Sequence, residues 1–197
     1  MIDAPVHQVA EIVDGELFLS PRPAAQHAVA SSRVGGLMSG PFDIGRGGPG
    51  GRWILDETEL HSGEDVLVPD IAGWRRDRMP TVPAVAYFEL APDWVCEVVS
   101  PKTGRLDRMR KLPVYARERV AHAWLIDPLQ RTVEVFRRPI ANQALAGTCP
   151  SKPGIRPRTR TPVPPVAISA AMWQMRDSRC WSRGHMYANR DRTKRQR

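Results

Sequence analysis

The sequence of 197 residues has few cysteines and no long apolar run. Its three cysteines, Cys96, Cys149 and Cys180, are too few and too irregularly spaced for a disulfide framework, and the sequence shows no Cys/His spacing typical of a zinc site. No stretch approaches the roughly 18 apolar residues that span a membrane. The N-terminal residues also lack the apolar core of a secretory signal. We therefore expect a soluble, cytoplasmic protein with no membrane partner.

Acidic residues are nearly absent from one part of the chain. The 29 Lys and Arg residues outnumber the 21 Asp and Glu residues, which gives a net charge of +8. Residues 139–197 contain 12 of the basic residues but only two acids, Asp177 and Asp191, so residues 1–138 hold 17 basic and 19 acidic residues. A net positive charge ordinarily indicates a nucleic-acid partner. Here that signal comes only from the C-terminal part.

On this basis we divide the chain into a domain at 1–138 and a tail at 139–197. The tail is rich in Pro and Arg, and residues 150–165 are too dense in proline for either a helix or a strand. Because the tail has little apolar surface to offset its ordering entropy, we expect a largely disordered C-terminal extension. The abrupt change suggests a reading-frame change in the coding sequence. A genuine nucleic-acid-binding tail is the alternative.

The domain alternates strand patterns with helix patterns. Asp14-Gly15 is typical of a hairpin turn within residues 11–20. The glycine-rich residues 40–51 lack the Gly-Lys-Ser/Thr of a phosphate-binding loop, so we expect a surface loop. Periodicity predicts the remaining elements, namely helices at 24–38 and 104–119, the second kinked at Pro113, and strands at 52–60, 66–74, 94–99, 121–127 and 132–137. This order predicts an α/β fold with one central mixed sheet flanked by helices.

Two acidic residues lie in apolar segments that are rich in β-branched residues. Asp70 follows Val66-Leu67-Val68-Pro69, and Glu97 lies within Trp94-Val95-Cys96-Glu97-Val98-Val99. A buried carboxylate needs a partner or a shifted pKa, so each acid either pairs with an arginine or shares a metal ion or a proton with the other. If the two strands are neighbours, both carboxylates and the Val98 carbonyl supply the hard oxygen ligands that Mg²⁺ prefers.

A series of short motifs in a fixed order indicates a family. In chain order they are Glu11-Ile-Val-Asp-Gly-Glu, Ser20-Pro-Arg-Pro followed by His27, Val68-Pro-Asp, Glu97-Val-Val-Ser-Pro, Asp107-Arg-Met-Arg-Lys, Tyr115-Ala and Trp124-Leu-Ile-Asp-Pro. Over about residues 9–138 this set resembles the Uma2 family, a domain of unknown function in the PD-(D/E)XK nuclease superfamily. A single dipeptide would carry no information, but the ordered set is specific.

The resemblance implies a restriction-endonuclease-like core with a metal site. It implies that Asp70 and Glu97 are ligands of Mg²⁺ or Mn²⁺, with the Val98 carbonyl beside them. Glu11 and His27 resemble family positions next to the site. Glu11 is expected to be a third, water-mediated ligand, and His27 is expected to contact a phosphate or to assist a proton transfer.

The lysine of the superfamily motif is displaced in this chain. That lysine normally follows the glutamate by two residues, where this sequence has Val99. Lys111 resembles a migrated replacement that would stabilise charge on the phosphate. The alternative for Lys111 is a pair with Asp107 one helical turn earlier, and Lys102 is the substitute candidate.

These observations predict a Mg²⁺-dependent endonuclease that hydrolyses DNA phosphodiester bonds, with Asp70 and Glu97 holding the metal and Lys111 assisting. The alternative from another functional class is a catalytically inactive nuclease-fold module that binds DNA or a protein. The sequence is compatible with a homodimer and does not decide the oligomeric state.

Overall fold

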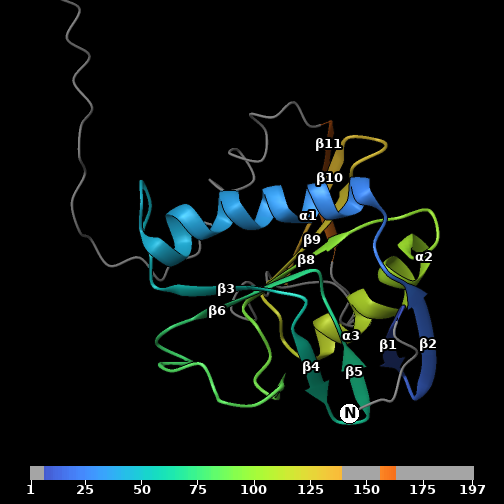
Figure 1. Cartoon of the computed structure of the whole chain (residues 1–197), viewed down its shortest axis with the longest axis horizontal. Helices are drawn as coiled ribbons and strands as arrows, with labels where there is room; N and C mark the ends of the chain where they lie inside the picture. The colour runs from blue at the N-terminus through green and yellow to red at the C-terminus, as the bar shows by residue number, and fades with distance from the viewer. Residues whose placement is uncertain (1–6, 139–155, 163–197) are drawn as a thin grey trace, which may run out of the picture.

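The computed structural model describes residues 7–138 and 156–162, which form two β-sheets with helices packed around them (Figure 1). The larger sheet has six strands. In spatial order they are β11 (Arg156–Pro162), β10 (Thr132–Arg137), β9 (His122–Asp127), β8 (Trp94–Val98), β6 (Ile71–Arg75) and β3 (Arg52–Asp56). Only β8 and β9 are parallel in this sheet, so it is mixed. The predicted α/β class is confirmed.

A second sheet of five strands stands beside the first, where the sequence predicted one sheet. Its order is β2 (Glu16–Pro21), β1 (Gln8–Val13), β5 (Asp65–Leu67), β4 (Glu59–Ser62) and β7 (Tyr87–Phe88). The predicted strand 66–74 is divided between the sheets, because β5 ends at Leu67 and β6 begins at Ile71. Pro69 cannot donate to a strand ladder, and the chain passes from one sheet to the other around it.

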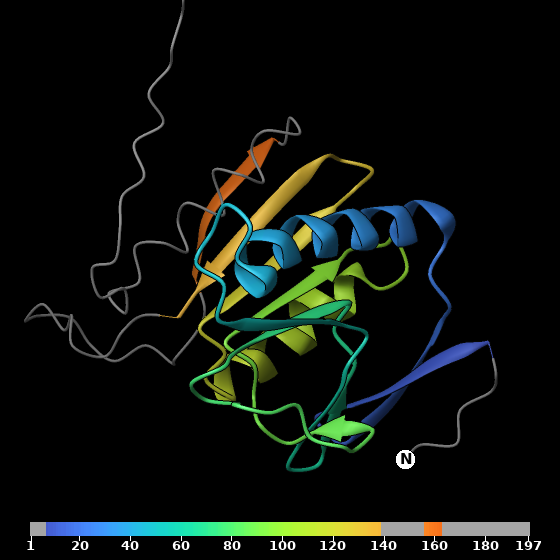
Figure 2. The same ribbon diagram turned by 60° about the vertical axis from the view of Figure 1, so that its left-hand side comes forward.

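Helices cover both faces of the six-stranded sheet. Helix α1 (Ala25–Met38) and the π-helical turn η1 (Ser39–Ile44) lie across one face. A continuous helical run lies on the other face and contains α2 (Gly104–Leu106), the π-helical turn η2 (Asp107–Lys111) and α3 (Leu112–Arg117). Figures 1 and 2 show α1 and α3 on opposite sides of this sheet. None of the helices in the described parts of the chain is long and apolar enough to cross a membrane.

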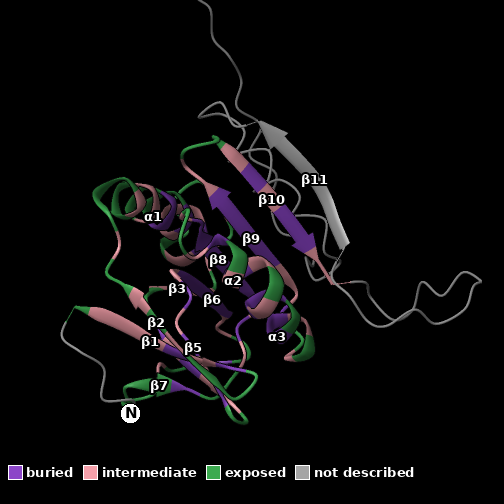
Figure 3. Cartoon of the chain, turned by 90° about the vertical axis from the view of Figure 1, so that its right-hand side faces the viewer, coloured by how far each residue is buried: buried purple, intermediate pink, exposed green. Residues whose placement is uncertain are grey.

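The alternation of side chains along β8 is confirmed. Trp94 and Cys96 pack in the core cluster beneath α1, whereas Val95 and Val99 pack in the cluster beneath α3. Glu97 has the same parity as Val95 and Val99, so it faces α3. Figure 3 shows β8 and β9 coloured mostly as buried. The fold therefore places one acidic residue inside its central layer.

The β1–β2 hairpin turns at the predicted dipeptide, where Asp14 and Gly15 have φ values of 52° and 76°. The helix predicted in residues 24–38 is also confirmed. It continues through η1 to Ile44 and ends at Gly45 in the left-handed conformation. The predicted surface loop therefore begins at Gly45 rather than at Gly40.

The prediction that residues 150–165 form neither helix nor strand is wrong for residues 156–162. These residues form β11, which pairs antiparallel with β10 from Thr132 to Arg137. An edge strand tolerates proline, because one side of its backbone makes no ladder bonds. The rest of the predicted disordered tail lies outside the described residues.

Candidate active site

A cavity of about 370 Å³ opens at the end of β8. The register of β6 and β8 pairs Ile71 with Cys96, which brings Asp70 beside the last two residues of β8, Glu97 and Val98. One rim of the cavity is the segment after β2, and the other is the loop after β8 that contains Lys102. Strands from both sheets and helices from both layers thus meet at one place.

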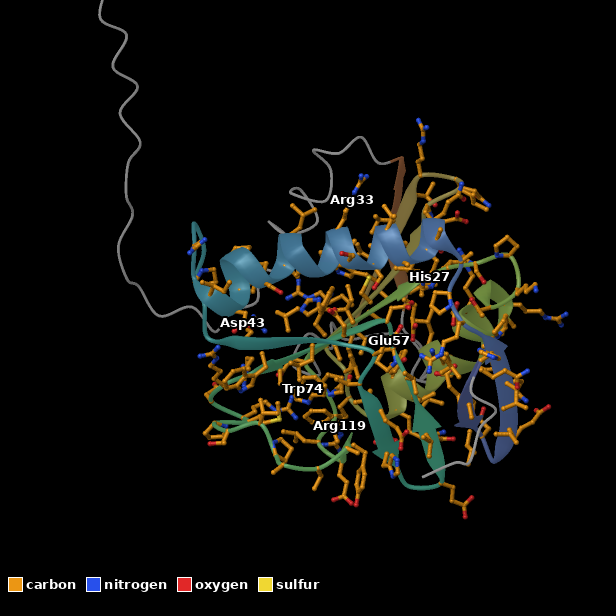
Figure 4. The ribbon with its side chains drawn as sticks, in the orientation of Figure 1. His27, Arg33, Asp43, Glu57, Trp74 and Arg119 are labelled. Atoms are coloured by element: carbon orange, nitrogen blue, oxygen red, sulfur yellow. The ribbon has the colours of Figure 1, made fainter. Side chains whose placement is uncertain are left out.

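Asp70 is held by the backbone of β8 and by a histidine. Its Oδ2 accepts a hydrogen bond from the Val98 N–H at 2.7 Å, and its Oδ1 lies 3.3 Å from His27 Nε2. Figure 4 shows His27 near the beginning of α1. The hydrogen bond with Asp70 raises the pKa of His27, and the Val98 backbone adds to this effect. His27 therefore faces the two groups predicted to contact a metal.

The helical run from α2 to α3 contacts Glu97 on the face of β8 that lies away from α1. Glu97 Oε1 lies 2.8 Å from Lys111 Nζ and accepts a hydrogen bond of 2.5 Å from the Tyr115 hydroxyl. Lys111 and Tyr115 are one helical turn apart, so both reach the same carboxylate. Lys111 is 2% exposed and Glu97 is 3% exposed. The predicted catalytic lysine is thus a buried partner of the predicted metal ligand.

Glu11 enters the same site from β1 in the second sheet. Its Oε1 accepts a hydrogen bond from the Val68 N–H at 2.8 Å and lies 2.8 Å from Lys111 Nζ. Lys111 also lies 3.9 Å from Asp107. The pair with Asp107, which is the alternative to a catalytic role for Lys111, is therefore present. It is the longest of the three contacts of Lys111 with carboxylates.

The site contains more acid than base. Glu11, Asp70, Glu97 and Asp107 all line the cavity, while Lys111 and His27 are the cations in contact with them. Burial raises the pKa of Glu97 to about 8, an effect that Lys111 opposes and the neighbouring acids increase. Burial likewise raises the pKa of Asp107 to about 6. The cluster therefore has room for additional positive charge.

The neighbouring acids also change the pKa of Lys111. Burial by itself would lower the pKa of this lysine, but Glu11 and Glu97 together raise it well above the usual value. Lys111 therefore remains an ammonium group within the cleft.

Two residues of the site were not predicted. Tyr115 was noted only as part of a motif, and Asp107 only as a helical partner of Lys111. Their spacing with Lys111 is the signal that would have found them, since residues 107, 111 and 115 fall at four-residue intervals. Lys102 lines the cavity at its rim and is exposed. The structure brings all predicted site residues to one cavity.

Within residues 7–138 and 156–162, no three side chains of His, Cys, Asp or Glu converge closely enough to form a metal-binding cluster. Mg²⁺ commonly uses only one or two protein carboxylates and completes its octahedron with waters and substrate phosphate. Asp70 and Glu97 offer two carboxylates, and the excess of acid favours a bound cation. The donor set therefore fits Mg²⁺ or Mn²⁺ better than a metal that needs three or four protein ligands.

A protein-family model covers most of the chain. Residues 6–174 match the family model described as "Uma2: Putative restriction endonuclease". The match continues past residue 138, the last residue of the resemblance found in the sequence. The boundary between domain and tail, and the origin of the tail, remain predictions. No curated protein matches the sequence.

The fold is also similar to a solved structure. That solved structure is described as the crystal structure of "a putative nuclease belonging to DUF820 from Anabaena variabilis ATCC 29413". The two share 23% sequence identity and superpose with a TM-score of 0.58, over 81% of this chain and 84% of the other. At that identity the likeness concerns the fold.

Proposed function

Because the chain belongs to the Uma2 family, we propose that it is a metal-dependent endonuclease that hydrolyses DNA phosphodiester bonds. In this proposal Asp70 and Glu97 hold Mg²⁺ or Mn²⁺, with the Val98 carbonyl as a further oxygen ligand and Glu11 acting through water. The observation that carries the proposal is the grouping of Asp70 with three buried acids, Glu11, Glu97 and Asp107, in one cavity. Three buried acids around one buried lysine are costly without another cation.

The bound metal would lower the pKa of an attacking water and neutralise charge on the phosphoryl oxygens. The residues around the metal would have different roles. Asp70 is fixed by the Val98 N–H, and Glu97 is fixed by Lys111 and Tyr115. Each carboxylate is therefore held in place before a ligand arrives.

Four basic side chains line the cavity, namely Arg22, His27, Lys102 and Lys111. Lys111 and His27 are the two that contact the predicted metal ligands. Lys111 remains charged because Glu11 and Glu97 stabilise its ammonium group, so it would stabilise negative charge that develops on the phosphate. His27 Nε2 faces Asp70, from where it would contact a phosphate or pass on a proton.

Nicking of supercoiled plasmid DNA tests this function. We expect the wild type to cleave in Mg²⁺ or Mn²⁺ and not in EDTA. Asp70→Asn and Glu97→Gln keep the shape of each side chain and should remove cleavage while the proteins remain folded. Glu64→Gln is the matched control, because Glu64 is exposed and does not line the cavity. Equal cleavage by all four proteins would refute the assignment.

A second candidate is the catalytically inactive nuclease-fold module that binds DNA or a protein. The observation in its favour is the replacement of the motif lysine by Val99, together with the engagement of Lys111 by two carboxylates. It predicts DNA or protein binding that persists in Asp70→Asn, with no cleavage by the wild type in any divalent cation. Metal-dependent cleavage by the wild type would exclude it.

A further inference from the structure

Tyr115 donates its hydroxyl hydrogen to the site without lining the cavity. The side chain is 1% exposed, and the hydroxyl donates to Glu97 Oε1 at 2.5 Å. The residues that line the cavity include Glu97 and Lys111 but not Tyr115. Tyr115 therefore contacts the carboxylate from behind, where a substrate in the cavity cannot touch it.

Lys111 cannot fix Glu97 alone, because its ammonium group is shared. Lys111 Nζ lies 2.8 Å from Glu11, 2.8 Å from Glu97 and 3.9 Å from Asp107, and 3.5 Å from the Val68 carbonyl. A phenol has a single O–H to donate, and Tyr115 gives it to Glu97. Its ring is held in the core cluster beneath the six-stranded sheet. The position of this donor is therefore set by packing rather than by charge.

We propose that Tyr115 is the positioning residue for Glu97. With Tyr115 and Lys111 both on Oε1, the carboxylate has one preferred orientation, and Oε2 is the oxygen that a ligand in the cavity meets. The nature of that ligand, a divalent metal ion, rests on the proposed function. The orientation of Glu97 does not depend on it.

The variant Tyr115→Phe removes the hydroxyl and keeps the ring in the core. We expect a crystal structure of this variant to show the Glu97 carboxylate turned, or in two orientations. We also expect calorimetric titration to show Mn²⁺ binding that is roughly 10-fold to 100-fold weaker, as is typical when a hydrogen-bond partner of a metal ligand is lost. Tyr87→Phe is the matched control, because Tyr87 stacks on His61 in the other sheet and does not line the cavity.

The outcomes separate the two proposals. A turned Glu97 carboxylate in Tyr115→Phe supports the positioning role even if the wild type binds no Mn²⁺. The absence of Mn²⁺ binding by the wild type would refute only the proposed metal site. An unchanged Glu97 with unchanged Mn²⁺ affinity would overturn the positioning role. A lower melting temperature without either change would assign Tyr115 a purely structural role and would also overturn it.

A measurement on the wild-type fold covers the case in which Tyr115→Phe does not fold. Protein labelled with fluorotyrosine gives a separate fluorine resonance for each of its three tyrosines, and the Tyr87→Phe and Tyr187→Phe variants assign the other two, which leaves the resonance of Tyr115. We expect the resonance of Tyr115 to move in Glu97→Gln, because its acceptor changes. A Tyr115 resonance that stays in place would overturn the proposal.

Discussion

Glu97 is the least exposed acid of the site. It is buried beneath α3, and its pKa rises to about 8 because burial penalises the charged carboxylate. A folded-state pKa above the ordinary value of 4.5 means that folding favours the protonated form. The contribution of Glu97 to stability is therefore highest at low pH and decreases as the pH rises from about 4.5 to about 8.

Glu97→Gln should remove this dependence on pH. In metal-free buffer we expect the variant to become more stable relative to the wild type as the pH rises from about 5 to about 8, because the neutral amide has no charge to bury. Urea unfolding of both proteins at several pH values, with Glu64→Gln as the control, measures the difference. A difference in stability that stays constant over this range would contradict the account.

Lys111 should be essential for the stability of the metal-free protein. Lys111→Met keeps an unbranched side chain that is one atom shorter, and it leaves Glu11 and Glu97 without their shared cation. We expect a loss of about 3 kcal/mol, as is typical when one partner of a buried ion pair is removed. Lys102→Met is the control, because Lys102 is exposed at the rim of the same cavity. Equal thermal stability of the two variants would show that Lys111 is not a buried counter-ion.

At this scale the sequence predicted where the acids lie but not what contacts them. Asp70 and Glu97 were evident because an acid in a β-branched apolar run is unusual. Asp70 contacts His27, which lies 43 positions earlier in the sequence. Lys111 contacts both Glu97 in one sheet and Glu11 in the other, and so links the two sheets. Such contacts depend on packing, which local patterns do not encode.

Among the elements, the helical run 104–117 has the most direct effect on the site. A kink is predicted at Pro113, and the structure has the π-helical turn η2 just before it, in which the Leu112 N–H bonds to the Asp107 carbonyl five residues back. A proline ring clashes with the carbonyl four residues earlier in a regular helix, and a wider turn relieves that clash. The wider turn carries Asp107 and Lys111, and π-helical turns are frequent at functional sites.

Gly104 sets the distance between this run and β8. A Cβ atom at Gly104 would lie 2.5 Å from Val99 Cγ1, and Val99 is buried. We expect Gly104→Ala to cost about 1–3 kcal/mol, as overpacking does, and to reduce cleavage by moving Lys111 away from Glu97. Gly36→Ala is the control, because Gly36 lies in α1 and a methyl group added there would meet no other atom within 4 Å. That variant should gain about 0.5–1 kcal/mol.

Chemical denaturation and plasmid nicking measure these two effects. The expected order of stability is Gly36→Ala, then wild type, then Gly104→Ala. A Gly104→Ala protein as stable and as active as the wild type would show that the helical run does not depend on this close approach.

The type of each main element was predictable, and several boundaries were not. The hairpin, α1 and strands β8, β9 and β10 follow from turn residues and periodicity. The division of residues 66–74 between two sheets and the extension of α1 to Ile44 did not follow from local patterns. In both cases tertiary packing decides where an element ends.

For the whole molecule, one of the two edges of the six-stranded sheet lies at β11 and the other lies at β3. The pairing of β11 with β10 covers the backbone of a strand that would otherwise form an unpaired edge. A chain that ends at residue 138 should therefore be less stable and more prone to associate than one that ends at residue 165. Urea unfolding and size-exclusion chromatography of both truncations measure this. Identical behaviour would show that β11 does not protect the edge.

The structure of a crystal soaked in Mn²⁺ is the most direct test of the account as a whole, because anomalous scattering locates the metal without reference to activity. We predict one strong anomalous peak in the cavity, within coordination distance of an oxygen of Asp70 and an oxygen of Glu97, and no such peak in Asp70→Asn. A cavity without a peak in the wild type, or a peak bound by neither carboxylate, would contradict the metal-dependent nuclease that the geometry supports.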